Sequence, residues 1–214
     1  ENLSEGNKSI REFISFFRDL IIILLLVLFV RSFFVTPFRI NGSSMEASYH
    51  DKEYIIVDKF SYLNLPVTYN NTASGNTWDT VTSLILKNLR IPVGDPVRGD
   101  VVVITPHVDK QREYYIKRVI ALPGDTIRFE DGNVFIKKPG SSAFIQINEP
   151  YLSLANSGQT RLPEHVENNE FTVPEGYYWV MGDNRNNSAD SRSCFRNCIG
   201  TMTIAHFIKR KDIV

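Results

Sequence analysis

The chain has 214 residues, of which 43% are hydrophobic, and its 24 Lys+Arg are balanced by 24 Asp+Glu. This length and apolar content predict a globular domain with its own core and exclude a disordered tail. The balanced charge gives no electrostatic reason to expect nucleic-acid binding. The two cysteines, Cys194 and Cys198, cannot by themselves assemble a four-ligand zinc site, so we expect no metal and no cofactor. A disulfide and two free thiols both remain open.

The first predicted element is an apolar membrane anchor at 20–36, after an N-terminal segment at 1–19. No polar residue occurs from Leu20 to Val30. A spanning helix needs roughly 20 apolar residues, and phenylalanines at helical spacing upstream extend the same helix towards the N-terminus. Arg31 reaches the far interface by snorkelling, and Pro37 marks the expected end of the helix.

A cleavable signal peptide is the competing interpretation of this segment, since it has a similar short apolar region. The sequence that follows, "RSFFVTPF", is bulky and has no small-x-small cleavage pattern, which favours an uncleaved anchor. Basic residues lie on both sides of the span, with a slight excess before it, so a cytoplasmic N-terminus is the expected orientation.

Short β-type runs dominate the part after the anchor, 37–214. Runs such as "EYIIVDKF", "DVVVITP" and "EGYYWVMGD" are rich in Val, Ile, Tyr and Phe and are bounded by turn residues. The pair Asp131-Gly132 between two alternating runs predicts a β-hairpin. We therefore expect a mainly β domain, barrel-like or strongly coiled, with an insertion at 64–97 and a smaller β lobe at about 126–175.

A candidate nucleophile, Ser44, lies in the stretch "INGSSMEASYHDKEYIIVDKFSY", but a serine needs a base from elsewhere in the chain. None of the four histidines stands in a triad-like stretch. Lys117 is the unusual candidate, because it occurs inside the apolar run "EYYIKRVIAL", where burial would lower the pKa of its amine. Strand alternation directs Arg118 to the opposite face. A solvent-facing Lys117 and a merely polar Ser44 remain the alternatives on these stretches alone.

Five motifs in order resemble bacterial type I signal peptidase, the membrane-anchored serine protease that removes signal peptides from exported proteins. They are "VRSFFVTPFRI", "SSMEASYHDKEYIIVDKFSY", "RGDVVVI", "YYIKRVIALPGD" and "MGDNRNNSADSR". The resemblance implies that Ser44 is the nucleophile and Lys117 the general base of a Ser-Lys dyad that works through an acyl-enzyme. It also implies that Ser188 orients the lysine, and that the Asp190–Arg192 pair supports this corner with Arg118 nearby.

The resemblance further implies the substrate side of the site. Small residues of an extended precursor would enter apolar pockets lined by four residues: Phe38, Ile40, Met45 and Ile116. Gly42 stands where some members have a serine that helps to bind the oxyanion, so a backbone N–H must serve here. Exported preproteins, the lipid bilayer and the export machinery are the implied partners. The implied location is the bacterial inner membrane, single-pass, with the catalytic domain on the periplasmic side.

Two departures from the family pattern concern the turn and the tail. The family commonly has Pro-Thr-Leu where this chain has Ala47, Ser48 and Tyr49, and two cysteines flank the last motif. A Cys194–Cys198 disulfide would fit an oxidising compartment. Two alternatives remain: a self-cleaving repressor-type Ser-Lys protease, which the anchor disfavours, and a catalytically silent membrane-anchored β binding domain, which predicts the loss of Ser44 or Lys117.

Overall fold

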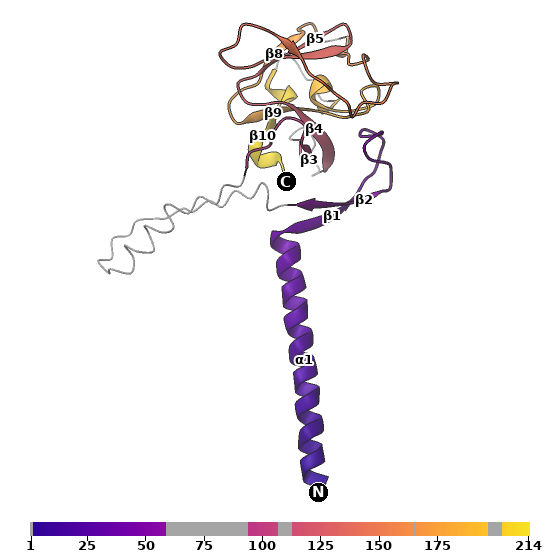
Figure 1. The fold of residues 1–214 in the computed structure, drawn as a ribbon, viewed down its shortest axis with the longest axis vertical. Coiled ribbons are helices and arrows are strands. Elements are labelled where there is room, and N and C mark those ends of the chain that lie inside the picture. Colours follow the sequence, from indigo (N-terminus) through magenta and orange to yellow (C-terminus); the bar gives the residue numbers. More distant parts are fainter. Residues whose placement is uncertain (1, 59–93, 107–112, 165, 197–202) are drawn as a thin grey trace, which may run out of the picture.

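The computed structural model describes residues 2–58, 94–106, 113–164, 166–196 and 203–214 (Figure 1). Its helix and strands follow in the order α1 (Asn2–Phe33), β1 (Val35–Arg39), β2 (Tyr54–Asp58), β3 (Val101–Ile104), β4 (Tyr115–Ala121), β5 (Thr126–Glu130), β6 (Asn133–Lys137), β7 (Ile145–Gln146), β8 (Glu170–Thr172), β9 (Tyr177–Met181) and β10 (Ile208–Lys209). The 3-10 helices are η2 (Ser191–Arg196), η3 (Thr203–His206) and η4 (Arg210–Asp212). A mainly β chain with one N-terminal apolar helix is thus confirmed, while most of the predicted insertion at 64–97 lies outside the described residues.

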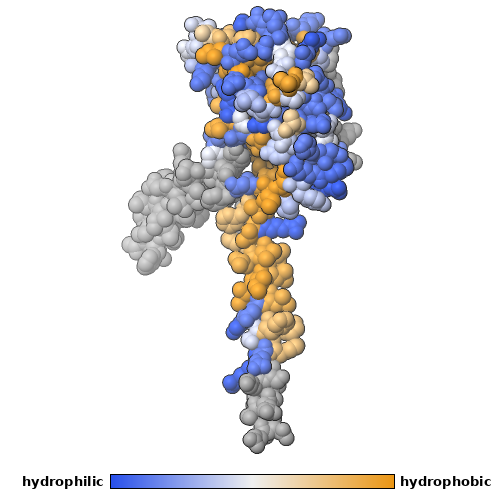
Figure 2. All heavy atoms as spheres, turned by 45° about the vertical axis from the view of Figure 1, so that its right-hand side comes forward, coloured by the Kyte–Doolittle hydropathy of each residue, from blue (hydrophilic) through white to orange (hydrophobic). Residues whose placement is uncertain are grey.

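Helix α1 is long and apolar enough to cross a membrane. Its segment Arg11–Arg31 has 21 residues, a mean hydropathy of 2.7 and no buried side chains, and at about 1.5 Å per residue it spans about 30 Å, the thickness of the hydrocarbon core. Figure 2 shows this apolar column below a mostly hydrophilic head. The helix therefore fits a membrane anchor.

The helix ends earlier than Pro37, which corrects the expected boundary. The last helical hydrogen bond runs from Phe34 N–H to Val30 C=O, and Pro37 lies inside β1, opposite Ile56 of β2. Proline is tolerated in this strand because β1 pairs only with β2 in a two-stranded sheet, so one side of the strand has no pairing partner among the described residues. Pairing with β2, rather than the proline, thus takes the chain out of the helix.

The other described strands form two four-stranded antiparallel sheets, ordered β10-β9-β4-β3 and β7-β6-β5-β8. A core cluster lies between them, built from alternate residues of both sheets and centred on Trp179, which is fully buried against Phe129 and Phe171. A second cluster covers the other face of β4 and β9, where Val119 and Val180 are fully buried. Each of these two strands is therefore buried on both faces.

The predicted hairpin at Asp131-Gly132 is present as the turn between β5 and β6. Both residues have positive φ, 49° and 77°, as the two central positions of a type I′ turn require. Near the C-terminal end, Cys194 is disulfide-bonded, and the only other cysteine of the sequence, Cys198, lies outside the described residues. The choice that the sequence left open for Cys194 is settled in favour of a disulfide.

Candidate active site

Ser44 is presented by a turn that follows β1 directly. Gly42 has a φ of +112°, a conformation that glycine adopts without strain, and its N–H donates to the Asp51 carboxylate at 2.7 Å. Met45, the next residue in the turn, has a buried side chain that is 1% exposed. The Ser44 carbonyl accepts a hydrogen bond from Asn184 N–H at 3.0 Å. The backbone around Ser44 is therefore held from both of its sides.

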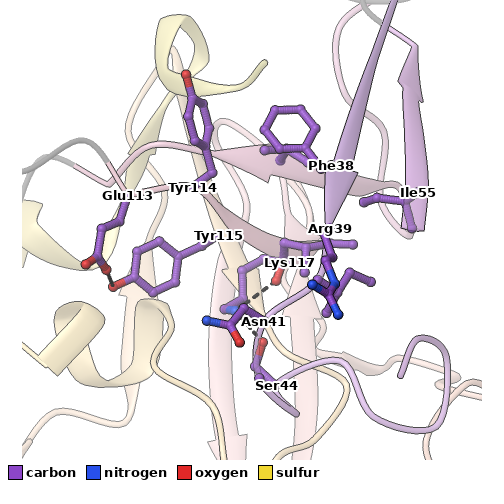
Figure 3. Close-up of a pocket in the computed structure, with 13 residues that line it drawn as sticks. Phe38, Arg39, Asn41, Ser44, Ile55, Glu113, Tyr114, Tyr115 and Lys117 are labelled. Atoms are coloured by element: carbon purple, nitrogen blue, oxygen red, sulfur yellow. Dashed lines mark hydrogen bonds between the residues drawn. The ribbon is translucent and has the colours of Figure 1, made fainter. Parts of the chain in front are cut away.

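Lys117 comes from β4, 73 residues further along the chain, and meets Ser44 at hydrogen-bond distance. Its Nζ lies 2.8 Å from Ser44 Oγ and donates to Ile116 C=O, also at 2.8 Å (Figure 3). The side chain is 1% exposed. The alternative of a solvent-facing lysine is thus wrong, because β4 is covered on the face that Lys117 shares with Val119.

Burial changes the acid–base chemistry of this amine. Removal from water lowers the pKa of Lys117 from 10.5 to about 8. The carboxylates of Asp190 and Asp183 oppose this by raising the pKa, while Arg192 and Arg196 lower it further. A substantial fraction of the amine is therefore neutral near pH 8, and the neutral form is the one that can accept a proton from a serine hydroxyl.

The loop that carries "GDNRNNSADSR", residues 182–192, closes the site beside Lys117. Asp190, fully buried, accepts from Arg192 through both carboxylate oxygens, at 3.0 and 2.9 Å, and from Gly182 N–H at 3.0 Å. Burial alone would raise the pKa of Asp190, but Arg192 and these hydrogen bonds hold it below its ordinary value. The predicted Asp190–Arg192 pair is thus formed, and it ties the two ends of the loop together.

Ser188 is half-buried in the same loop, with its hydroxyl oxygen buried, and it packs against Gly182. A Cβ added to Gly182 would lie 2.3 Å from Ser188 Oγ. Within the described residues this hydroxyl makes no hydrogen bond of good geometry, although it lies near enough to Asp190 to help lower the pKa of that carboxyl. Among the described residues, Lys117 Nζ forms hydrogen bonds with Ser44 and Ile116, so the orienting role of Ser188 stays a prediction.

Arg118 points to the opposite face of β4, as strand alternation predicts, and forms an ion pair that the sequence did not reveal. It donates to both carboxylate oxygens of Asp183 at 2.9 and 2.7 Å and to Gly99 C=O at 2.7 Å. Ser48, at one of the positions that depart from the family pattern, donates to Asp183 at 2.5 Å. Hydrogen bonds and an ion pair therefore connect the turn that carries Ser44 and Ser48, here called the nucleophile turn, with β4 and the 182–192 loop. Asp183 lies within the quoted motif "MGDNRNNSADSR", which is the signal that could have marked it.

A groove of about 340 Å³ opens beside the dyad (Figure 3). Ser44 and Lys117 lie at its polar end. Its lining includes three of the four predicted pocket residues, Phe38, Ile40 and Ile116. Met45 is instead buried beneath the turn. The lining residues that sequence reasoning missed are Arg39, Asn41, Ile55, Val103, Glu113, Tyr114 and Tyr115.

The apolar end of the groove is built by β1, β2, β3 and the start of β4. The rings of Phe38 and Tyr114 pack at 5.1 Å between centroids, and Ile55 and Val103 lie with them along the groove. The groove is thus open and apolar at this end, and it lies within reach of a nucleophile and a buried base. This arrangement is suited to acyl transfer on an extended peptide.

The chain is similar to a known protein family and to several of its members. The family described as "Signal peptidase, peptidase S26" matches residues 13–214. Signal peptidase I of Pseudomonas aeruginosa is 34% identical over 79% of this chain and 59% of its own length. Signal peptidase I of Bacillus amyloliquefaciens is 31% identical over 82% and 75%, and signal peptidase I T of Bacillus subtilis is 30% identical over 88% and 79%. The chain thus spans less than two thirds of the length of the Pseudomonas relative. A crystal structure of a signal peptidase I from Enterococcus faecalis is 26% identical, with a TM-score of 0.38, over 56% of this chain and 94% of that one.

Proposed function

The chain belongs to the signal peptidase family S26, and from this membership we propose that it is a serine endopeptidase that removes signal peptides from exported preproteins, with Ser44 as nucleophile and Lys117 as general base. The observation that carries the proposal is the 2.8 Å distance between Ser44 Oγ and the Nζ of a lysine that is 1% exposed. A surface lysine has a pKa near about 10.4 and is almost entirely protonated at neutral pH. This amine has no carboxylate at salt-bridge distance among the described residues and a pKa of about 8, so its neutral fraction is far larger.

The first chemical step follows from this pair. Neutral Lys117 Nζ takes the proton of Ser44 Oγ as the oxygen attacks the carbonyl carbon of the scissile peptide bond. When the tetrahedral intermediate collapses, the lysine gives this proton to the leaving amine, and an ester between Ser44 and the signal peptide remains. Lys117 then activates a water molecule that hydrolyses the ester and frees Ser44.

The oxyanion of the intermediate needs a donor near Ser44. Gly42 N–H is already used by Asp51. Ser44 N–H has no acceptor among the described residues, so it is the backbone donor available to the oxyanion. The Asn184 contact to Ser44 C=O holds the peptide plane that follows this N–H.

The groove supports a substrate in extended conformation. A strand that passes along it places every second side chain against the same wall. Phe38, Ile40 and Ile116 line the groove, and we expect its walls to accept small side chains, in keeping with cleavage after small-x-small sequences. In this proposal the precursor reaches the site from the export machinery, α1 crosses the inner membrane with its N-terminus in the cytoplasm, and the β domain works on the periplasmic side, where the Cys194 disulfide is stable.

We expect the full chain in detergent micelles to cut an exported precursor at a single position directly after a small-x-small sequence. Mass spectrometry of both products locates the cut. The matched control is the same precursor with a bulky residue, such as Phe, at the position before the cut, which the groove should exclude. Absence of cleavage by the wild type would contradict the proposal and favour the silent binding domain, and cleavage of the chain itself would favour the repressor-type protease.

The pH dependence of the reaction should report the Lys117 amine. Because only neutral Lys117 accepts the serine proton, kcat/KM should rise about tenfold per pH unit at acidic pH and level off above about pH 8. The measurement is kcat/KM from pH 6 to pH 10 on a fluorogenic peptide. A histidine base would instead place the acid limb near about pH 6.5, and such a profile would argue against Lys117.

A further inference from the structure

Part of the smaller β lobe, residues 149–160, reaches back to the 182–192 loop and packs on it. Asn186 N–H donates to Asn156 at 3.1 Å, and the Asn186 side chain donates to Ala155 C=O at 2.9 Å. Neither contact involves the groove or the dyad. The loop beside Lys117 is therefore supported from behind by a segment that the chemistry itself does not use.

The strongest of these contacts is a buried ion pair between Arg185 and Glu149. The Arg185 side chain is fully buried, and its guanidinium meets both Glu149 carboxylate oxygens, one of them at 3.1 Å, and Thr160 Oγ1 at 2.6 Å. Its Nε donates to Gly182 C=O at 3.1 Å. Arg185 thus connects the smaller lobe to the residue whose backbone packs on Ser44.

Tyr151 connects Glu149 to the other arginine of the site. Its hydroxyl donates to Glu149 at 2.7 Å, and its ring lies 3.9 Å from the centre of the Arg118 guanidinium. Burial raises the pKa of Tyr151, so the phenol keeps its proton and remains a donor. Arg118 in turn holds Asp183 at the start of the loop. Residues 149–151 therefore contact both Arg185 and Arg118.

We propose that Glu149 and Tyr151 are positioning residues for catalysis, which clamp Arg185 and Arg118 and so hold the 182–192 loop against Ser44 and Lys117. This inference rests on the proposed function.

The electrostatics explain why the clamp matters to the loop. Without Glu149, Arg185 becomes a buried charge with no carboxylate partner among the described residues, and a buried charge left in this way is strongly unfavourable. The loop must then move to let water reach the guanidinium. Gly182 and Ser188 move with the loop, and the Lys117 amine becomes more exposed to water.

Hydration of the site has a kinetic signature that simple destabilisation lacks. The low pKa of Lys117 depends first on its removal from water. The charged groups that face it are Asp183, Asp190, Arg192 and Arg196, and the Tyr115 ring lies 5.4 Å from Nζ. A displaced loop should raise the pKa of Lys117 and shift the acid limb of the kcat profile to higher pH, whereas a smaller folded fraction leaves the limb in place.

The test compares the full-length variants Glu149→Gln and Tyr151→Leu with wild type in detergent micelles, on one fluorogenic small-x-small peptide. We expect kcat to fall about 10- to 100-fold, as for a displaced catalytic geometry, with KM within about twofold because the groove lies on the other side of the dyad. The acid limb should move to higher pH. Glu149→Asp, which keeps the carboxylate, should recover part of kcat.

The matched control is Glu164→Gln, the same chemical change at an exposed position of the same lobe, and it should behave as wild type. If Glu149→Gln does not fold, Tyr151→Phe decides, since it removes only the hydroxyl and leaves the ring on Arg118; it should lower kcat about threefold, the value of one hydrogen bond. An unchanged kcat, or a loss without a shift of the acid limb, would overturn the clamp. A wild type that does not cleave would instead refute the proposed protease function.

Discussion

Ser44→Ala and Lys117→Met should each lower kcat by at least about 1000-fold, because each removes one half of a unit that acts together. The first removes the attacking oxygen, and the second removes the amine that takes its proton at 2.8 Å. The double variant should be no worse than either single variant. Single-turnover cleavage of a precursor, with acyl-enzyme trapped by acid quench, measures both the rate and the intermediate.

The control for the nucleophile is its neighbour. Ser43→Ala removes a hydroxyl whose described contact is with the Asn187 side chain at 3.0 Å, and it should keep activity within a few-fold of wild type. An inactive Ser43→Ala beside an active Ser44→Ala would reverse the assignment of the nucleophile.

Lys117→Met should also separate loss of chemistry from loss of fold. The folded-state pKa of Lys117, about 8, lies below its ordinary value of 10.5, so the charged amine lowers the free energy of unfolding at every pH below about 8. This destabilisation disappears as pH rises from about 8 to 10.5. Replacing the amine by a thioether should therefore raise the free energy of unfolding below pH 8 by up to roughly 3 kcal/mol. A variant both inactive and less stable would mean that Lys117 has a structural role.

Gly182→Ala should abolish most activity through sterics alone. A Cβ at this position would lie 2.3 Å from the Ser44 carbonyl oxygen and 2.3 Å from Ser188 Oγ. The backbone cannot retreat easily, since Asp190 holds its N–H and Arg185 its C=O. We expect kcat to fall about 100-fold and the free energy of unfolding to fall by about 1–3 kcal/mol, as for other overpacked sites.

Gly94→Ala is the matched control for this substitution. Gly94 does not have positive φ, and a Cβ there would meet nothing within 4 Å among the residues that the structure describes. Steady-state kinetics and thermal unfolding should leave this variant at wild-type values. Near-normal kcat for Gly182→Ala would mean that the loop and the nucleophile turn adjust to each other, which would also weaken the clamp inferred for Glu149 and Tyr151.

Much of the fold follows from local sequence patterns. Three features depend only on neighbours within a few residues, and the sequence therefore predicts them: the apolar run that forms α1, the short β-type runs and the Asp131-Gly132 turn. Helix α1 ends at Phe33, earlier than Pro37, the helix stop that the sequence predicts. The proline lies instead in a strand with a single pairing partner, and pairing with β2 depends on residues about 20 positions away.

Motif order and an unusual lysine in an apolar strand are enough to mark Ser44 and Lys117 as candidates for the dyad. The burial of Lys117 and its contact with Ser44 depend on tertiary packing, because the water around an amine is removed by elements distant in sequence. The same holds for Asp183 with Arg118, and for Arg185 with Glu149, which are 65 and 36 residues apart. A single charged residue does not reveal its partner. The packing of β4, the 182–192 loop and the segment that carries Glu149 brings these charges out of water together, and each is stable there only because the others are present.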